Sequence, residues 1–225
     1  MTMQPSENDV LYEDNHLLAI NKPAGLLTQH AGVEADNLED MARSWVKITR
    51  NKPGNVYLHA VHRLDRVTSG VALFALREKA LQRMNAAMRA RSVTKIYHAL
   101  ITREPPGENG TLVHYMRHSR MRSRIVGREE KDARRAELDY QVLKRSGRLI
   151  LLEIRLVTGR YHQIRAQLGA CGCPVVGDQL YGSHDGYAHE AIALHHRRME
   201  FAHPTTKAGV IIEAGYPDAW PLQRS

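Results

Sequence analysis

Residues 62–76 read HRLDRVTSGVALFAL, and this stretch sets the pattern for much of the chain. The apolar run VALFAL at its end predicts a buried strand. Before that run, Asp65 stands between Arg63 and Arg66 and is followed by Thr-Ser-Gly, a sequence typical of a tight turn. The stretch therefore predicts a carboxylate in a short loop at the edge of a sheet. A purely structural ion pair in a Thr/Ser turn is the alternative.

Further elements are predicted on both sides of this stretch. Before it, VLY and HLLAIN indicate a hairpin, and Asp36 with Glu39 forms a capping-box pattern ahead of a helix. After it, the pattern predicts in order a helix over 77–91, a strand over 94–101, irregular basic structure as far as 130, strands over 135–144 and 148–157, a short helix over 161–170 and a strand near 191–201. Because strands outnumber helices and cluster, the predicted fold class is α+β, a mixed, largely antiparallel sheet with helices on it.

The composition is that of a globular protein. The 225 residues are 43% apolar and 25% charged, and no apolar run approaches the 18 or so residues that span a bilayer. The first twenty residues hold four acidic side chains and no basic segment, so no secretory signal is expected. Cys171 and Cys173 are too few and too close together for a disulfide framework, which favours the reducing cytoplasm. We predict a short tail over 1–9 and one domain over 10–225.

Basic residues are unevenly distributed. The formal charge of +8 divides into −7 over residues 1–40 and +15 over residues 41–225. Four arginines stand almost at alternate positions: Arg117, Arg120, Arg122 and Arg124. On a strand, that spacing would place guanidinium groups in a row on one face. The row favours RNA as a partner, with the arginines on its phosphate backbone, whereas a solvated basic surface that binds nothing is the alternative.

Motifs of cofactor-dependent chemistry are absent from the sequence. No GxGxxG, P-loop, HExxH or GxSxG occurs, and the pair Cys171 and Cys173 lacks the usual spacing of a zinc site. We therefore expect neither a metal nor an organic cofactor.

A second group of polar residues lies at 156–165, LVTGRYHQIR. Here a half-buried strand turns at Gly159 and opens a helix whose first turns carry Arg160, His162 and Arg165. Amides and cations at the start of a helix suit anionic groups. Solvated surface arginines would give the same pattern.

Together with five further motifs, HRLDRVTSG resembles the RluA-type pseudouridine synthases. The other motifs, in the family's order, are NKPAG (21–25), KIYHAL (95–100), TGRYHQIRAQL (158–168), GCPVVGDQLYG (172–182) and LHHRRMEFAHP (194–204). No S4-like RNA-binding domain is expected before them. The resemblance implies that a specific uridine in transfer or ribosomal RNA is isomerised to pseudouridine without a cofactor. It also implies the pseudouridine synthase fold, a sheet in two halves with flanking helices and a central RNA-binding cleft.

The resemblance also assigns roles to five residues. Asp65, the acid of HRLDR, is the catalytic carboxylate, and Arg165, the last residue of HQIR, pairs with it. Tyr97 stacks on the target base, Leu194 packs beside that base, and Arg63 helps to displace the uridine from its RNA stack.

Three neighbouring residues are further candidates for substrate binding. Arg66, Arg160 and His162 lie within the same two polar motifs as the residues with assigned roles. From the basic residues and the resemblance together, the expected partner is RNA. We expect no membrane and no second protein as partner, and we expect the protein to be a monomer.

A single carboxylate suits this chemistry. The reaction breaks the bond from uracil N1 to C1′, turns the base and joins its C5 to C1′. Asp65 could attack C1′, stabilise an oxocarbenium-like centre or take the 2′ proton toward a glycal, and the sequence leaves these routes open. A glycosidase generally needs a second acid, and none stands out near these motifs. A non-catalytic RNA-binding protein is the other alternative, but it would have no use for an acid among arginines that bind phosphate.

Overall fold

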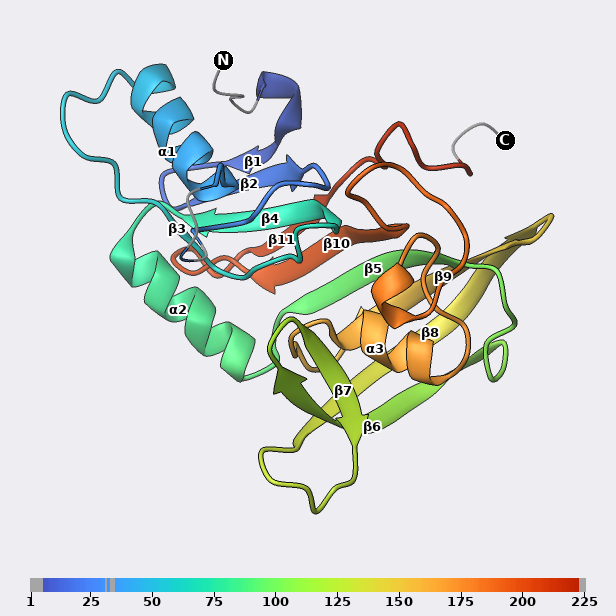
Figure 1. Ribbon diagram of the computed structural model, residues 1–225. Helices are drawn as coiled ribbons and strands as arrows, with labels where there is room; N and C mark the ends of the chain where they lie inside the picture. Colours follow the sequence, from blue (N-terminus) through green and yellow to red (C-terminus); the bar gives the residue numbers. More distant parts are fainter. Residues whose placement is uncertain (1–5, 31, 33–34, 223–225) are drawn as a thin grey trace. The chain divides into compact units, whose positions relative to one another are not determined.

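The computed structural model describes residues 6–30, 32 and 35–222. Its chain divides into two compact units, one of Met1–Val93 with His196–Pro217 and one of Thr94–His195 with Asp218–Ser225 (Figure 1). Of the predicted tail over 1–9, residues 1–5 lie outside the described part, and Glu7–Asp9 form a 3₁₀ turn, η1. The last three residues of the predicted domain over 10–225 also lie outside it, as do positions 31, 33 and 34.

The first unit is built on a mixed sheet whose strands pair mostly antiparallel. Its elements are β1 (Val10–Glu13), β2 (Leu17–Lys22), α1 (Leu38–Thr49), β3 (His59–Ala60), β4 (Ser69–Ala75), α2 (Glu78–Arg89), most of β10 (Leu194–Ala202) and β11 (Gly209–Glu213). The strand order is β1-β2-β4-β10, with β3 beside β4 and β11 beside β10. The predicted hairpin is confirmed as β1 and β2, whereas β3 and β11 were not predicted.

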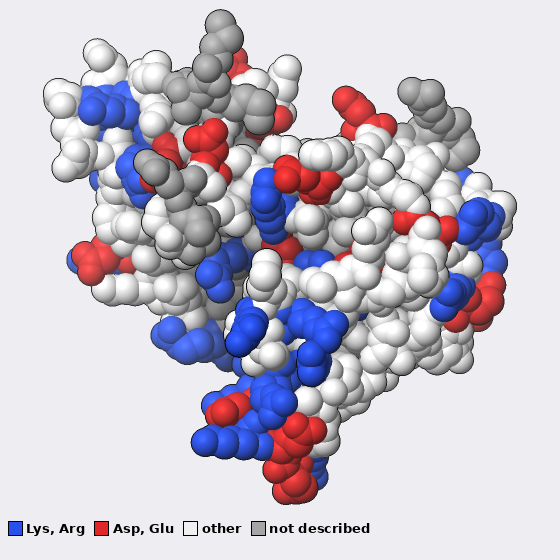
Figure 2. All heavy atoms as spheres, viewed as in Figure 1, with Lys and Arg blue, Asp and Glu red and all other residues white. Residues whose placement is uncertain are grey.

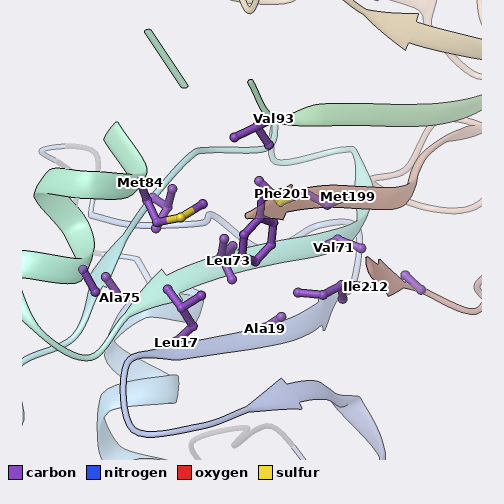
Figure 3. Close-up of a cluster of buried hydrophobic side chains, with 13 residues drawn as sticks. Leu17, Ala19, Val71, Leu73, Ala75, Met84, Val93, Met199, Phe201 and Ile212 are labelled. Carbon is purple, nitrogen blue, oxygen red and sulfur yellow. The ribbon is translucent and has the colours of Figure 1, made fainter. Parts of the chain in front are cut away.

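The strand β4 is buried along its whole length because a helix covers each of its faces. Val71, Leu73 and Ala75 share a cluster with Met84 of α2 (Figure 3). The alternate residues Ala72 and Phe74 join the cluster of α1. Full burial of a side chain such as Leu or Phe stabilises a fold by about 1.5–3 kcal/mol. Because both faces of β4 are buried, the run VALFAL contains no alternating polar residues.

The capping residue predicted for α1 was wrong by one position. Asn37, not Asp36, is the N-cap, and its side-chain oxygen accepts the amide N–H of Asp40 at 3.0 Å. The backbone of Asn37 is extended, so its side chain folds back over the first turn of the helix. The apolar face is confirmed, with Leu38, Met41, Ala42, Trp45 and Val46 all buried.

The second unit contains a longer antiparallel ladder with one α-helix. Its elements are β5 (Thr94–Ile101), β6 (Asn109–Ser119), β7 (Arg122–Val126), β8 (Arg134–Ser146), β9 (Leu149–Leu156), α3 (Gln163–Ala170) and the 3₁₀ turn η2 (Gln179–Tyr181). The strand order is β5-β9-β8-β6-β7, and every one of these pairs is antiparallel. The strand predicted over 94–101 is confirmed to the residue.

The prediction of irregular structure as far as residue 130 was wrong. That region forms the hairpin of β6 and β7, which pairs with β8 through β6. Its polar composition hid the pattern, because only scattered residues such as Leu112, Met116 and Ser123 face inward. In the described part of the chain, no helix is long and apolar enough to cross a membrane.

Candidate functional site

Asp65 lies half buried in a loop of the first unit, directly before β4. The loop is fastened to Thr28, whose hydroxyl oxygen accepts the amide N–H of Leu64 and donates to the Leu64 carbonyl, both at 3.0 Å. The amide of Thr68 donates to the Asp65 carbonyl at 3.0 Å and closes a turn. Arg63 is exposed in the same loop.

A buried cation, Lys22, lies beneath this loop. Its side chain is fully buried, and Nζ donates to the carbonyls of Pro23 at 2.8 Å, Leu26 at 2.7 Å and Arg66 at 3.2 Å. Burial lowers the pKa of Lys22 to about 7, while the charge of Asp65 raises it and that of Arg66 lowers it. Sequence reasoning missed Lys22, which joins the NKPAG segment to the Asp65 loop.

Arg66 also ties these two segments together. Its Nε donates to the Gly25 carbonyl, and the Gly25 amide donates back to the Arg66 carbonyl, each at 2.8 Å. Gly25 has φ +86°, a backbone conformation that favours glycine. The structure therefore gives Arg66 a role in holding the loop, in addition to the substrate contact predicted for it.

In the second unit, a turn fastened to β8 precedes α3. Thr158 Oγ1 accepts the Glu137 amide and donates to Gln163 Oε1, both at 2.8 Å. Gln163 Oε1 also accepts the Arg160 amide at 3.0 Å. His162 has φ +53°, a strained value for a non-glycine residue, which this network maintains. The predicted residues Arg160 and His162 thus occupy a firmly held turn.

Arg165 is buried in α3 and bound to a carboxylate of its own unit. Its Nε and one Nη donate to the two oxygens of Asp178 at 2.7 and 2.9 Å, and both side chains are almost fully buried. The guanidinium also lies over the ring of Tyr181, 5.2 Å from its centre. The resemblance pairs Arg165 with Asp65 and gave no sign of Asp178, so this bidentate partner is an addition to the predicted site.

Tyr97 and Leu194 are both nearly buried. Tyr97 lies on β5 opposite Ile154 of β9, and Leu194 begins β10. Both belong to the second unit, as does Arg165, whereas Asp65 and Arg63 belong to the first. Their predicted roles at the target base remain predictions.

The arginine row lies on the β6–β7 hairpin. Arg117 of β6 is directly opposite Arg124 of β7, and Arg122 shares their face. Arg120 is exposed in the connecting turn with φ +47°. Arg117 forms one ion pair, at 3.3 Å to Glu130. Figure 2 shows Lys and Arg side chains gathered over this hairpin. Two strands, rather than the single strand considered from the sequence, bring the guanidinium groups together.

The described residues contain no cluster of three or more His, Cys, Asp or Glu side chains able to hold a metal ion. Both cysteines are free. Burial raises the pKa of the Cys173 thiol to about 11 and also raises that of Cys171, so both are protonated at neutral pH.

The largely antiparallel sheet with flanking helices defines an α+β protein. Its arginine-lined hairpin, together with a carboxylate in a braced loop, suits a polyanionic substrate. A family model described as RNA pseudouridylate synthase matches residues 16–170. The chain therefore belongs to the RNA pseudouridine synthases, of the RluA type, and is an RNA isomerase.

Known relatives cover most of this chain. It is 26% identical to tRNA pseudouridine synthase C of Vibrio parahaemolyticus over 97% of its length and 94% of that protein. It is 36% identical to ribosomal large subunit pseudouridine synthase C of Rickettsia prowazekii over 77% of its length, but spans 56% of that relative. Human RNA Pseudouridylate Synthase Domain Containing 4 matches with a TM-score of 0.78 at 23% identity, covering 95% of this chain and 90% of the human one. This likeness confirms the predicted fold.

Proposed function

We propose that Asp65 is the catalytic carboxylate of this synthase and acts on a uridine of transfer RNA or large-subunit ribosomal RNA. The observation that carries the proposal is the setting of Asp65 in a loop braced by Thr28 and the buried Lys22. Catalysis needs a reacting group held in one geometry, which such bracing supplies. The position of Asp65 within HRLDR matches the family's catalytic acid.

Asp65 would act at the C1′ carbon of the target nucleotide. It could form a bond to C1′, stabilise a cationic C1′ as the N1 bond breaks, or remove the 2′ proton. In each route the uracil turns, its C5 bonds to C1′, and the C5 proton is lost to solvent. Release of that proton is therefore a measure of turnover common to all three routes.

The remaining predicted residues would bind and hold the nucleotide. Tyr97 and Leu194 would contact the uracil, which must leave its stack to react. Arg63 would occupy the position in the RNA stack that the displaced uracil leaves. Arg165 would support the Asp65 carboxylate through a charge-assisted contact. Arg66, Arg160 and His162 would contact the adjoining RNA.

Three relatives support the choice of RNA. Their names give transfer RNA for the Vibrio parahaemolyticus protein, the large ribosomal subunit for the Rickettsia protein and dual specificity for the RluA protein of Vibrio cholerae, which is 30% identical over 87% of this chain. Mapping pseudouridines in a strain that lacks this protein identifies its uridine. A cytoplasmic monomer remains our prediction.

Replacement of Asp65 tests the proposed role directly. We expect Asp65→Asn to abolish pseudouridine formation, a loss of at least about 1,000-fold, because the amide can neither attack C1′ nor carry the negative charge. RNA binding should stay within a few-fold of wild type, since one repulsion with phosphate is removed. The measurement is tritium release from RNA labelled at uridine C5.

Asp218→Asn provides the matched control. Asp218 is exposed, so the same substitution there should leave tritium release unchanged. Release by the Asp65→Asn protein at a rate near that of wild type would remove Asp65 from the catalytic role.

A further inference from the structure

The Tyr181 hydroxyl joins three groups in the second unit. It accepts the amide N–H of Ser123 at 2.9 Å, donates to the Ser123 carbonyl at 3.2 Å and lies 3.1 Å from Nδ1 of His162. A phenol has one proton and two lone pairs. With the proton on the Ser123 carbonyl and one lone pair on the Ser123 amide, a lone pair remains that can accept a proton from His162. This arrangement favours a proton on Nδ1 of His162.

The Tyr181 ring also supports Arg165. The guanidinium lies 5.2 Å from the ring centre while Asp178 holds its Nε and one Nη. Asp178 directly precedes η2, which Tyr181 ends, so one short segment supplies both supports. Gly169 of α3 permits this approach, because a Cβ there would lie 2.8 Å from the Tyr181 carbonyl oxygen.

Ser123 provides a fixed anchor on the hairpin. It lies between Arg122 and Arg124 but faces the opposite side, where its Oγ donates to the Tyr161 carbonyl at 2.6 Å. Both main-chain groups of Ser123 are used by the Tyr181 hydroxyl. One face of the hairpin thus presents arginines, and the other holds Tyr161 and Tyr181.

From this arrangement we infer that Tyr181 is a positioning residue for the chemical step, fixing Arg165 through its ring and His162 through its hydroxyl. The inference rests on the proposed roles of Arg165 in support of the carboxylate and of His162 in contact with the adjoining RNA. Tyr181 acts through these two residues and is assigned no contact with the RNA.

Two substitutions separate the ring from the hydroxyl. Tyr181→Phe keeps the ring under Arg165 and removes the hydroxyl. We expect its single-turnover rate at saturating RNA to fall about 10-fold, the effect of roughly one hydrogen bond. Tyr181→Leu also removes the ring, and its rate should fall about 100-fold. The dissociation constant for RNA should stay within a few-fold in both, because the exposed arginines that would bind phosphate are untouched, so most of the loss appears in the rate.

Tyr187→Phe is the matched control. The Tyr187 hydroxyl is buried and has no hydrogen-bond partner among the described residues, so its removal should leave the rate unchanged.

A second measurement does not depend on activity. In protein labelled with ¹⁵N-histidine, the two ring nitrogens of His162, identified by their loss in His162→Gln, should show the proton on Nδ1. Tyr181→Phe should shift the signals toward the Nε2–H form, and Tyr187→Phe should not.

The outcomes are decisive in each case. A wild-type rate in Tyr181→Phe overturns the role of the hydroxyl, and a wild-type rate in Tyr181→Leu overturns the role of the ring. A rate loss explained wholly by unfolded protein in the sample overturns both. If wild-type protein forms no pseudouridine in any RNA, the proposed function fails instead. The histidine signals then decide about the Tyr181 contact, and an unchanged pattern in Tyr181→Phe overturns it.

Discussion

Lys22 and Arg165 are both buried cations, one in each unit, but they are compensated in different ways. Lys22 meets three main-chain carbonyls, whereas Arg165 meets the carboxylate of Asp178 in a bidentate pair. Carbonyl dipoles satisfy the N–H donors without cancelling the charge, and burial lowers the pKa of Lys22 to about 7. A guanidinium cannot lose its proton in this range, so its charge needs a counter-charge.

The difference shows what each cation can do. Lys22 fastens a loop by bonding to its backbone, and it can lose its charge while still donating hydrogen bonds. Arg165 is held in orientation by the planar fork and stays charged, which suits the role proposed for it in support of a carboxylate. The two cations therefore respond differently to substitution and to pH.

The largest change in stability is expected at Arg165. Arg165→Ala leaves Asp178, which is 1% exposed, without its cation, and should lower the free energy of unfolding by about 3–5 kcal/mol. Arg165→Lys restores the charge but not the fork, so it should recover only part of this loss and of the single-turnover rate. Urea unfolding and single-turnover kinetics measure both effects.

Arg148→Ala is the control for this comparison. Arg148 is 74% exposed and pairs with Asp185 at the surface, so neither stability nor rate should change. Equal behaviour of Arg148→Ala and Arg165→Ala would show that burial of the Arg165 pair is unimportant.

A smaller loss of stability is expected at Lys22. Lys22→Met leaves the carbonyls of Pro23, Leu26 and Arg66 without this donor, and we expect the free energy of unfolding to fall by about 2–3 kcal/mol. The loss is smaller than at Arg165 because no buried ion remains behind. Lys47→Met on the exposed side of α1 should have no effect in the same urea titration.

Lys22 should also make stability depend on pH, in a direction fixed by its lowered pKa. Between the folded value of about 7 and the ordinary value of 10.5, the unfolded chain binds the Lys22 proton and the folded protein does not. Stability from this group therefore rises with pH, by up to about 1.4 kcal/mol per unit. Below pH 7 the folded protein also carries the Lys22 charge, so the cost of burying that charge lowers the free energy of unfolding in full. The difference between the wild-type and Lys22→Met curves of unfolding free energy against pH isolates this contribution. Two parallel curves would contradict it.

The smallest effect concerns Arg120 and Arg122, two exposed arginines whose side chains have no carboxylate or carbonyl partner among the described residues. Arg120→Ala with Arg122→Ala should flatten the log–log dependence of RNA affinity on salt by about one to two units, because about one counterion per neutralised phosphate is no longer released. The rate at saturating RNA should change little. Fluorescence anisotropy across a salt series measures this, with Arg148→Ala as control. If the slope of log affinity against log salt is unaltered, the hairpin is a solvated basic surface that does not bind RNA.

Much of the fold could be predicted because strong periodic patterns lie on buried elements. The strand over 94–101 and the apolar face of α1 agree with the structure in detail. The hairpin of β6 and β7 could not be predicted from its polar residues, since its pairing with β8 lies outside the local sequence. Local propensity gives no information on such a partner.

The roles at the candidate site were inferred from motifs and stay predictions, and the residues that support these side chains were not predicted. Lys22 and Asp178 belong to motifs quoted from the sequence, but lysine and aspartate are rarely fully buried, so no sequence rule indicates their burial. Their partners are main-chain carbonyls and an arginine thirteen positions away. Such contacts arise from the fold and carry no periodic signal.

The division of the first unit into two chain segments has a consequence for synthesis. β4 pairs with β10, and these strands are separated by residues 76–193, about 120 residues that a ribosome adds in roughly 6–24 s. During that interval the part of one β4 edge that β3 does not cover has no partner, although all seven residues of β4 are buried in the finished fold. The nascent chain therefore carries a partly unpaired apolar edge until β10 emerges near the end of synthesis, which prolongs its exposure to aggregation.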